Sequence, residues 1–157
     1  MLYYEQMEDT IKHKLKAYCI QHTEARIAEI VYAKQQSQES LESDTKSSAG
    51  DKYETSREMI QQDLTRYQVQ LLQAQQDLGL LQQLHLKKEQ PVVTLGSLVK
   101  TDKGFYFIAI SLGNIKLEDK PYIVISASSP IGKLFFGKAV GEHIVFNGSQ
   151  QEILEIS

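Results

Sequence analysis

Helix-interrupting residues are very unevenly distributed along this 157-residue chain. All three prolines and seven of the nine glycines follow residue 90, which leaves only Gly50 and Gly79 before it. Because proline and glycine disrupt helices more than any other residues, a stretch almost without them can form unusually long helices. We therefore place a domain boundary at residue 90, with a helical part at 1–90 and a second part at 91–157.

Two segments before this boundary have apolar residues at helical spacing. In 5–38 the apolar face is broad and comprises Ile11, Leu15, Tyr18, His22 and Ala25, with Ile20, Ile27 and Val31 adjoining. In 52–87 a cleaner seam recurs at alternating steps of three and four and comprises Ile60, Leu64, Tyr67, Leu71, Ala74, Leu78, Leu81 and His85. Such heptads are typical of coiled coils, so we expect an antiparallel helical hairpin with arms of about 50 Å. His22 and His85 are expected to pack in it.

The connection between these segments, from Gln38 to Glu58, is polar and acidic. It carries six acidic and three basic side chains. Residues 39–49 are rich in Ser, Thr and Asp and predict an irregular tip, with Gly50 as a cap or hinge. Lys87 and Lys88 suit the C-terminus of the second helix.

After residue 90 the pattern changes to short β-branched and aromatic runs separated by turn signals. The runs are 97–100, 105–111, 122–127, 142–146 and 151–156. Asn147-Gly148 predicts a type I′ hairpin, and Pro130 predicts the first turn of a short helix over 130–136. Together the two parts predict an α+β protein in which a coiled-coil hairpin precedes a small antiparallel sheet with one helix.

Composition narrows the function classes. The net charge is −3 and neither part carries a basic stripe, which argues against coating a nucleic-acid backbone. Cys19 is the single cysteine, so no disulfide can form within the chain, and the four histidines have no zinc-ligand spacing. No export signal or apolar run long enough for a membrane span is present. We expect a cytoplasmic protein without membrane contact.

The C-terminal part resembles a known family. The run from Ser128 to Glu142, Ser-Ser-Pro-Ile-Gly-Lys-Leu-Phe-Phe-Gly-Lys-Ala-Val-Gly-Glu, and the final Gln-Glu-Ile-Leu-Glu-Ile of 151–156 resemble the end of the GreA/GreB family of bacterial transcript-cleavage factors. The resemblance is specific over about 50 residues and weaker upstream to Leu95. In that family a coiled-coil hairpin precedes an FKBP-like domain, the layout expected here.

The resemblance implies a transcription elongation factor that is not itself an enzyme. Family members dock on RNA polymerase, insert the hairpin into its secondary channel, and stimulate the polymerase to cut backtracked RNA. Two tip carboxylates in a Gly-Asp-x-x-Glu motif help to hold a magnesium ion in the polymerase active centre. Gly50-Asp51-Lys52-Tyr53-Glu54 has this spacing.

Individual roles follow residue by residue from the resemblance. Asp51 and Glu54 would assist the polymerase magnesium, and Lys52 and Arg57 would lie near the RNA 3′ end. The expected polymerase contacts are Ser129, Pro130, Ile131 and Gly132. The implied partners are RNA polymerase and the nascent RNA, with no cofactor or metal of the protein's own beyond the shared magnesium. A hairpin closed within one chain predicts a monomer.

Other interpretations stay open. The family usually continues Asn-Ala-Glu-Tyr after the motif, whereas this chain has Thr55-Ser56-Arg57-Glu58. A channel-binding regulator without cleavage activity, of the Rnk-like or anti-cleavage type, is therefore an alternative. A coiled-coil adaptor that self-associates through the seam from Ile60 to His85 is another, and a prolyl isomerase rests on fold analogy alone.

Purely structural interpretations also remain for these residues. Asp51 and Glu54 suit a solvated helix N-terminus, where the dipole favours acids. Ser129-Pro130-Ile131 suits a turn that enters a helix. Asp44 and Glu58 are possible substitute ligands for the tip carboxylates.

Overall fold

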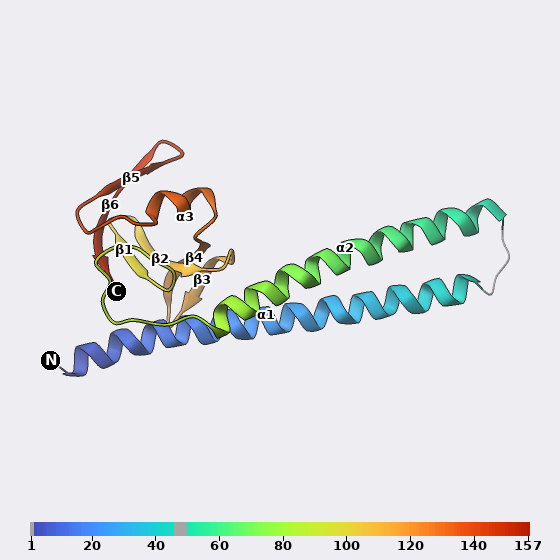
Figure 1. The fold of residues 1–157 in the computed structure, drawn as a ribbon, viewed down its shortest axis with the longest axis horizontal. Coiled ribbons are helices and arrows are strands. Elements are labelled where there is room, and N and C mark those ends of the chain that lie inside the picture. The colour runs from blue at the N-terminus through green and yellow to red at the C-terminus, as the bar shows by residue number, and fades with distance from the viewer. Residues whose placement is uncertain (1, 46–49) are drawn as a thin grey trace. The chain divides into compact units, whose positions relative to one another are not determined.

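The computed structural model describes the backbone of residues 2–45 and 50–157 and the side chains of residues 11–43 and 54–157. Two long helices, α1 (Leu2–Thr45) and α2 (Gly50–Gln82), come first. Six strands and one short helix follow, which confirms the predicted α+β class (Figure 1).

The strands form one sheet in the order β3-β4-β2-β1-β6-β5. Their bounds are β1 Leu98–Thr101, β2 Gly104–Ala109, β3 Gly113–Leu117, β4 Lys120–Ser126, β5 His143–Phe146 and β6 Ser149–Ile156. The short helix α3 spans Pro130–Phe135, between β4 and β5. Asn147 and Gly148 have φ of 51° and 78°, as the predicted type I′ turn between β5 and β6 requires.

Strand β3 was not predicted, because Gly113-Asn114 looked like a turn. The turn lies further on, at Glu118 and Asp119, whose φ values of 51° and 65° both fall in the left-handed region. The sheet also differs from the expected antiparallel arrangement. After β2 the chain passes to the edge strand β3 and returns in β4 beside β2, so β2 and β4 are parallel.

Both faces of the sheet are covered. Alternate residues of β2 serve the two faces, with Phe107 in one cluster and Ile108 in the other. On the first face the sheet packs against Leu15 and Cys19 of α1 and Leu81 of α2, all fully buried. On the second face the fully buried Phe135 of α3 is part of the cluster.

The chain divides into two compact units, one of residues 1–20 with 80–157 and one of residues 21–79. The first contains the sheet with the start of α1 and the end of α2. The second contains the remainder of the hairpin, where Ile30, Leu71 and Ala74 form a buried cluster. The composition boundary at residue 90 stays a prediction.

The predicted seam needs corrections. In α2, Leu71, Ala74 and Leu81 are buried as expected. His85 lies beyond the end of α2 and is exposed, and in α1 both His22 and Ala25 are exposed, so neither histidine packs in a seam. Among the described side chains of α1, the buried ones are Lys12, Leu15, Cys19, Thr23 and Ile30, of which the predicted face contained only Leu15. The broad distribution of apolar residues in α1 did not single out this stripe.

The helix ends also differ from prediction. Helix α1 continues to Thr45, so residues 39–45 are helical rather than irregular, whereas 46–49 lie outside the described residues. Helix α2 ends at Gln82, before Lys87 and Lys88. Two cations of α1 reach the segment after α2: Lys16 Nζ donates to the Leu84 carbonyl (3.0 Å), and the buried Lys12 donates to the Lys87 carbonyl. No helix in the described part is apolar enough over a sufficient length to cross a membrane.

Candidate functional site

The Gly-Asp-x-x-Glu motif occupies the first turn of α2. Gly50 is the first residue of α2. Because positions 51 and 54 are three residues apart in this helix, they lie on the same side of it. Negative side chains are favoured there by the helix dipole. The Glu54 side chain is exposed, and those of Asp51 and Lys52 lie outside the described residues.

The neighbouring charges follow the motif along α2. Arg57 and Glu58 are both exposed, three and four residues after Glu54, which puts them on the same side of the helix. Glu58 therefore remains a candidate to supply a carboxylate ligand beside Glu54. Asp44, the other candidate substitute, has its side chain outside the described residues.

The chemistry of this first turn fits assistance to a metal that another molecule holds. Magnesium takes six oxygen ligands, commonly one or two carboxylates with several waters or phosphate oxygens. Among the described residues, no group of three or more His, Cys, Asp or Glu side chains gathers in a way that could hold a metal ion. An exposed carboxylate can complete a coordination shell whose other ligands come from a partner.

The second predicted site, Ser129 to Gly132, forms the start of α3. Ser129 is the N-cap, and its Oγ accepts a hydrogen bond from the Gly132 backbone N–H (3.1 Å). The same hydroxyl donates to the Ser126 carbonyl (2.7 Å), and Pro130 occupies the first turn. A Cβ on Gly132 would lie 1.9 Å from the Ser126 carbonyl oxygen, so only glycine fits. Ser129 and Gly132 therefore stabilise the turn that enters α3, as the purely structural interpretation predicted.

The exposed residues of α3 and the turn after it are those able to meet a partner. Pro130 and Lys133 are exposed, and the apolar Leu134 and Phe136 are 37% and 50% exposed. Ile131 is half-buried and packs toward the sheet. Sequence reasoning missed Phe136. The adjacent pair Phe135-Phe136 could have indicated its exposure, since two consecutive residues at a helix end cannot both face the sheet.

A further groove, with both polar and apolar residues, lies between β6 and the segment after α2. A groove of about 310 Å³ is lined by Glu89, Gln90, Val140, Leu154, Glu155, Ile156 and Ser157. Leu154 is 41% exposed and Val140 57% exposed. Leu154 reaches the surface where the pairing of β1 with β6 shifts register between Lys100 and Thr101, an irregularity that re-aims side chains.

The single cysteine is not suited to nucleophilic chemistry. Cys19 is fully buried in the cluster beneath the sheet, and burial raises the pKa of its thiol to about 11. The reactive form of cysteine is the thiolate, which this environment disfavours. Burial, and then the charge of Glu118, also raise the pKa of Tyr122.

Comparison with models of known protein families finds no match for this chain, and comparison with curated proteins finds none either. Function is therefore inferred from the residues and the fold.

Proposed function

We propose that this protein is a cytoplasmic transcription elongation factor. It binds RNA polymerase at the secondary channel and stimulates the polymerase's own cleavage of backtracked RNA. The observation that carries the proposal is the place of the Asp51 and Glu54 motif, which begins the second helix of a long hairpin. The support is the match in spacing and position to the GreA/GreB motif, together with the resemblance of 128–142 and 151–156.

In this proposal Asp51 and Glu54 enter the polymerase active centre and complete a magnesium site that the polymerase supplies. The magnesium, when bound, lowers the pKa of a coordinated water and stabilises the phosphoryl group under attack. Asp51 and Glu54 orient the ion from one side of the helix. Lys52 and Arg57 would contact the RNA 3′ end. The protein itself is not an enzyme in this reaction.

Docking is assigned to the exposed residues of α3 and its following turn. Pro130 and Ile131 belong to the resembling run, and Leu134 and Phe136 add exposed apolar area. Aromatic and apolar anchors of this kind dominate the binding energy of many interfaces. Ser129 and Gly132 act indirectly, because they set the direction of α3 through the N-cap.

The test is RNA 3′-end cleavage by a stalled, backtracked elongation complex. Wild-type protein should accelerate cleavage, and Asp51→Ala/Glu54→Ala should lose the effect while still binding the polymerase. The double variant Glu24→Ala/Glu29→Ala removes the same charge from exposed positions of α1 and should cleave normally. Failure of the wild-type protein to bind the polymerase would refute the proposal.

The second candidate is a channel-binding regulator without cleavage activity. The exposed Arg57, three residues after Glu54 where the family usually has a carboxylate, favours it, because a guanidinium there competes with magnesium for Glu54. Binding without cleavage by the wild-type protein would support this candidate. Against the adaptor alternative, Leu71, Ala74 and Leu81 of its seam are already buried within the chain.

A further inference from the structure

The hairpin unit has a tightly packed part, here called the proximal segment and comprising residues 21–30 and 67–79. Ile30, Leu71 and Ala74 are buried in one cluster, with Ile27 and Tyr67 packed against it. Thr23 is also buried, at 2% exposure. Burial of apolar side chains from both helices holds the proximal segment together.

The remaining described part of the hairpin, the distal segment of residues 31–43 and 54–66, packs differently. None of its described side chains is buried. Ile60 and Leu64 occupy predicted seam positions of α2 but are only half-buried, and Leu41 of α1 is also half-buried. The hydrophobic contribution to helix pairing therefore falls sharply where the proximal segment ends.

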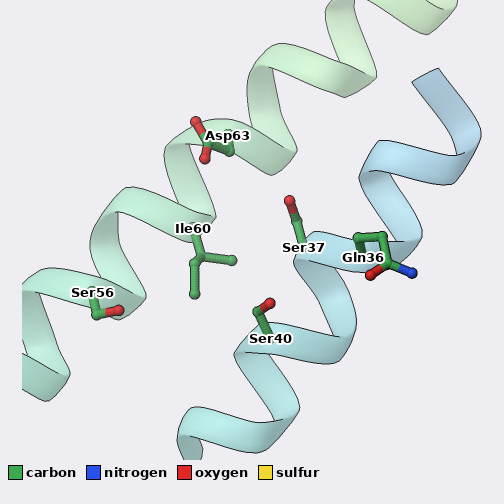
Figure 2. Close-up of a pocket in the computed structure, with 6 residues that line it drawn as sticks. All are labelled: Gln36, Ser37, Ser40, Ser56, Ile60 and Asp63. Carbon is green, nitrogen blue, oxygen red and sulfur yellow. The ribbon is translucent and has the colours of Figure 1, made fainter. Parts of the chain in front are cut away.

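A polar gap that is open to solvent lies between residues of the two helices in the distal segment. It has a volume of about 430 Å³ and is lined by Gln36, Ser37, Ser40, Ser56, Ile60 and Asp63. Figure 2 shows Ile60 of α2 reaching toward the space that Ser37 and Ser40 of α1 face. Hydroxyl, amide and carboxylate groups favour water in a gap of this size. A hydrated seam gives little of the burial that joins the proximal segment.

From this contrast we propose that the distal segment opens as a separate unit, with its two helices parting while the proximal segment stays packed. Opening exposes no buried side chain of the described distal residues, and the helical stretches that part are short enough to fray in water, which frees their backbone amides for exchange. Cooperative units of unequal stability are common within one fold. The hinge lies at the last buried layer, Ile30 with Leu71.

Opening would change the position of the acidic first turn of α2. Glu54 and the backbone of Asp51 belong to the end of α2 beyond the hinge, so they move with the distal segment. The tip can thus adjust to a partner without unfolding the sheet. Opening is a property of the chain alone and does not depend on which partner it has.

Hydrogen exchange of the full-length protein tests the proposal. Peptides from 54–66 should be protected at least about tenfold less than peptides from 71–79. Ser37→Leu fills the gap from α1 and gives Ile60 an apolar contact, so it should raise protection of 54–66 on the other helix about tenfold or more. Because the substitution lies on α1, its own helix propensity cannot account for this change in α2.

Ser43→Leu is the matched control. It makes the same substitution six residues further along α1, at an exposed position that does not line the gap, and should leave exchange of 54–66 unchanged. A second variant, Ile60→Ser, should lower protection of 54–66 and leave 71–79 as in the wild type. Equal protection of both regions in the wild type would overturn the proposal. So would equal effects of Ser37→Leu and Ser43→Leu, or a loss of protection in Ile60→Ser that reaches 71–79 equally.

Discussion

At the residue scale, two glycines show how tertiary contacts decide what a small residue is for. Gly132 is buried at the start of α3, where an added Cβ would meet the Ser126 carbonyl oxygen at 1.9 Å. Gly79 lies in α2 with nothing within 4 Å of the same added atom. From the sequence alone, both glycines are expected to weaken a helix. In the structure only Gly132 must be glycine, because an added Cβ has no room there.

We expect Gly132→Ala to destabilise the protein by about 1–3 kcal/mol, because the clash with backbone forces α3 or β4 to shift. Gly79→Ala should stabilise it by up to about 1 kcal/mol, because alanine favours the helix and has room. Urea unfolding of both variants followed by circular dichroism measures the two effects. Equal destabilisation by both substitutions would contradict the prediction.

The buried thiol predicts a dependence of stability on alkaline pH. The pKa of Cys19 is raised from 9.0 to about 11 in the folded protein, so the unfolded chain ionises first. The stabilising contribution is complete below pH 9 and is lost as the pH rises from about 9 to about 11. Over this range the free energy of unfolding should fall by on the order of 2 kcal/mol.

Urea unfolding at pH 8 and at pH 10.5 measures this loss. Cys19→Ala should reduce it without abolishing it, since the raised pKa of Tyr122 acts in the same direction. If Cys19→Ala kept the full wild-type loss, the thiol would not be its source.

At the element scale, the end of α2 is held by cations from another helix. Lys12 is 1% exposed and donates to the Lys87 carbonyl, and Lys16 donates to the Leu84 carbonyl. Lys87 and Lys88, the lysines that follow α2 in sequence, lie beyond its last residue, Gln82. Local sequence rules consider only neighbouring cations, whereas packing of α1 against this end brings two lysines from a distant part of the sequence to the carbonyl oxygens.

Lys12→Ala should therefore cost about 1–3 kcal/mol, because it leaves a part-buried carbonyl without its donor and removes a buried side-chain stem. Lys14→Ala is the control. It removes a surface ion pair with Glu118, whose side chain is 59% exposed, and should cost less than about 1 kcal/mol. Thermal unfolding of the two variants under identical conditions compares them, and equal costs would argue against a special role for Lys12.

At the scale of the whole molecule, the sheet depends on residues far from it in sequence. The cluster on one face of the sheet is completed by Leu15 and Cys19 of α1, Leu81 of α2 and Leu84 just after α2. A fragment of 91–157 would expose that face to water. The first compact unit, residues 1–20 with 80–157, keeps it covered.

We expect a chain in which a short Gly/Ser linker replaces residues 21–79 to fold, because every buried member of that cluster remains. The fragment 91–157 should aggregate or remain unfolded, since it lacks the cover from both helices. Dispersion of backbone amide signals in NMR spectra distinguishes the two. A well-folded 91–157 would show that the helix contacts are dispensable and would support the composition boundary at residue 90.

Part of the candidate site could be predicted from sequence and part could not. The motif spacing from Asp51 to Glu54 and the Pro130 helix start depend on neighbouring residues; α3 begins at Pro130 as predicted, whereas α2 begins at Gly50, slightly before the predicted start at 52. The cap role of Ser129, the crowding at Gly132 and the exposure of Phe136 depend on which face of α3 meets the sheet. That face is set by contacts with β4 and β5, which local patterns do not encode.

The amino-acid sequence by itself determined the long helices, the position of the chain reversal and the change to strands after residue 90. These follow from the placement of proline and glycine and from periodicity, which act over a few residues. Only the tertiary structure decided the burial of one stripe of α1, the strand β3 and the parallel pairing of β2 with β4. Those features depend on which distant segments pack together, because burial and strand pairing are gained only between elements that fold into contact.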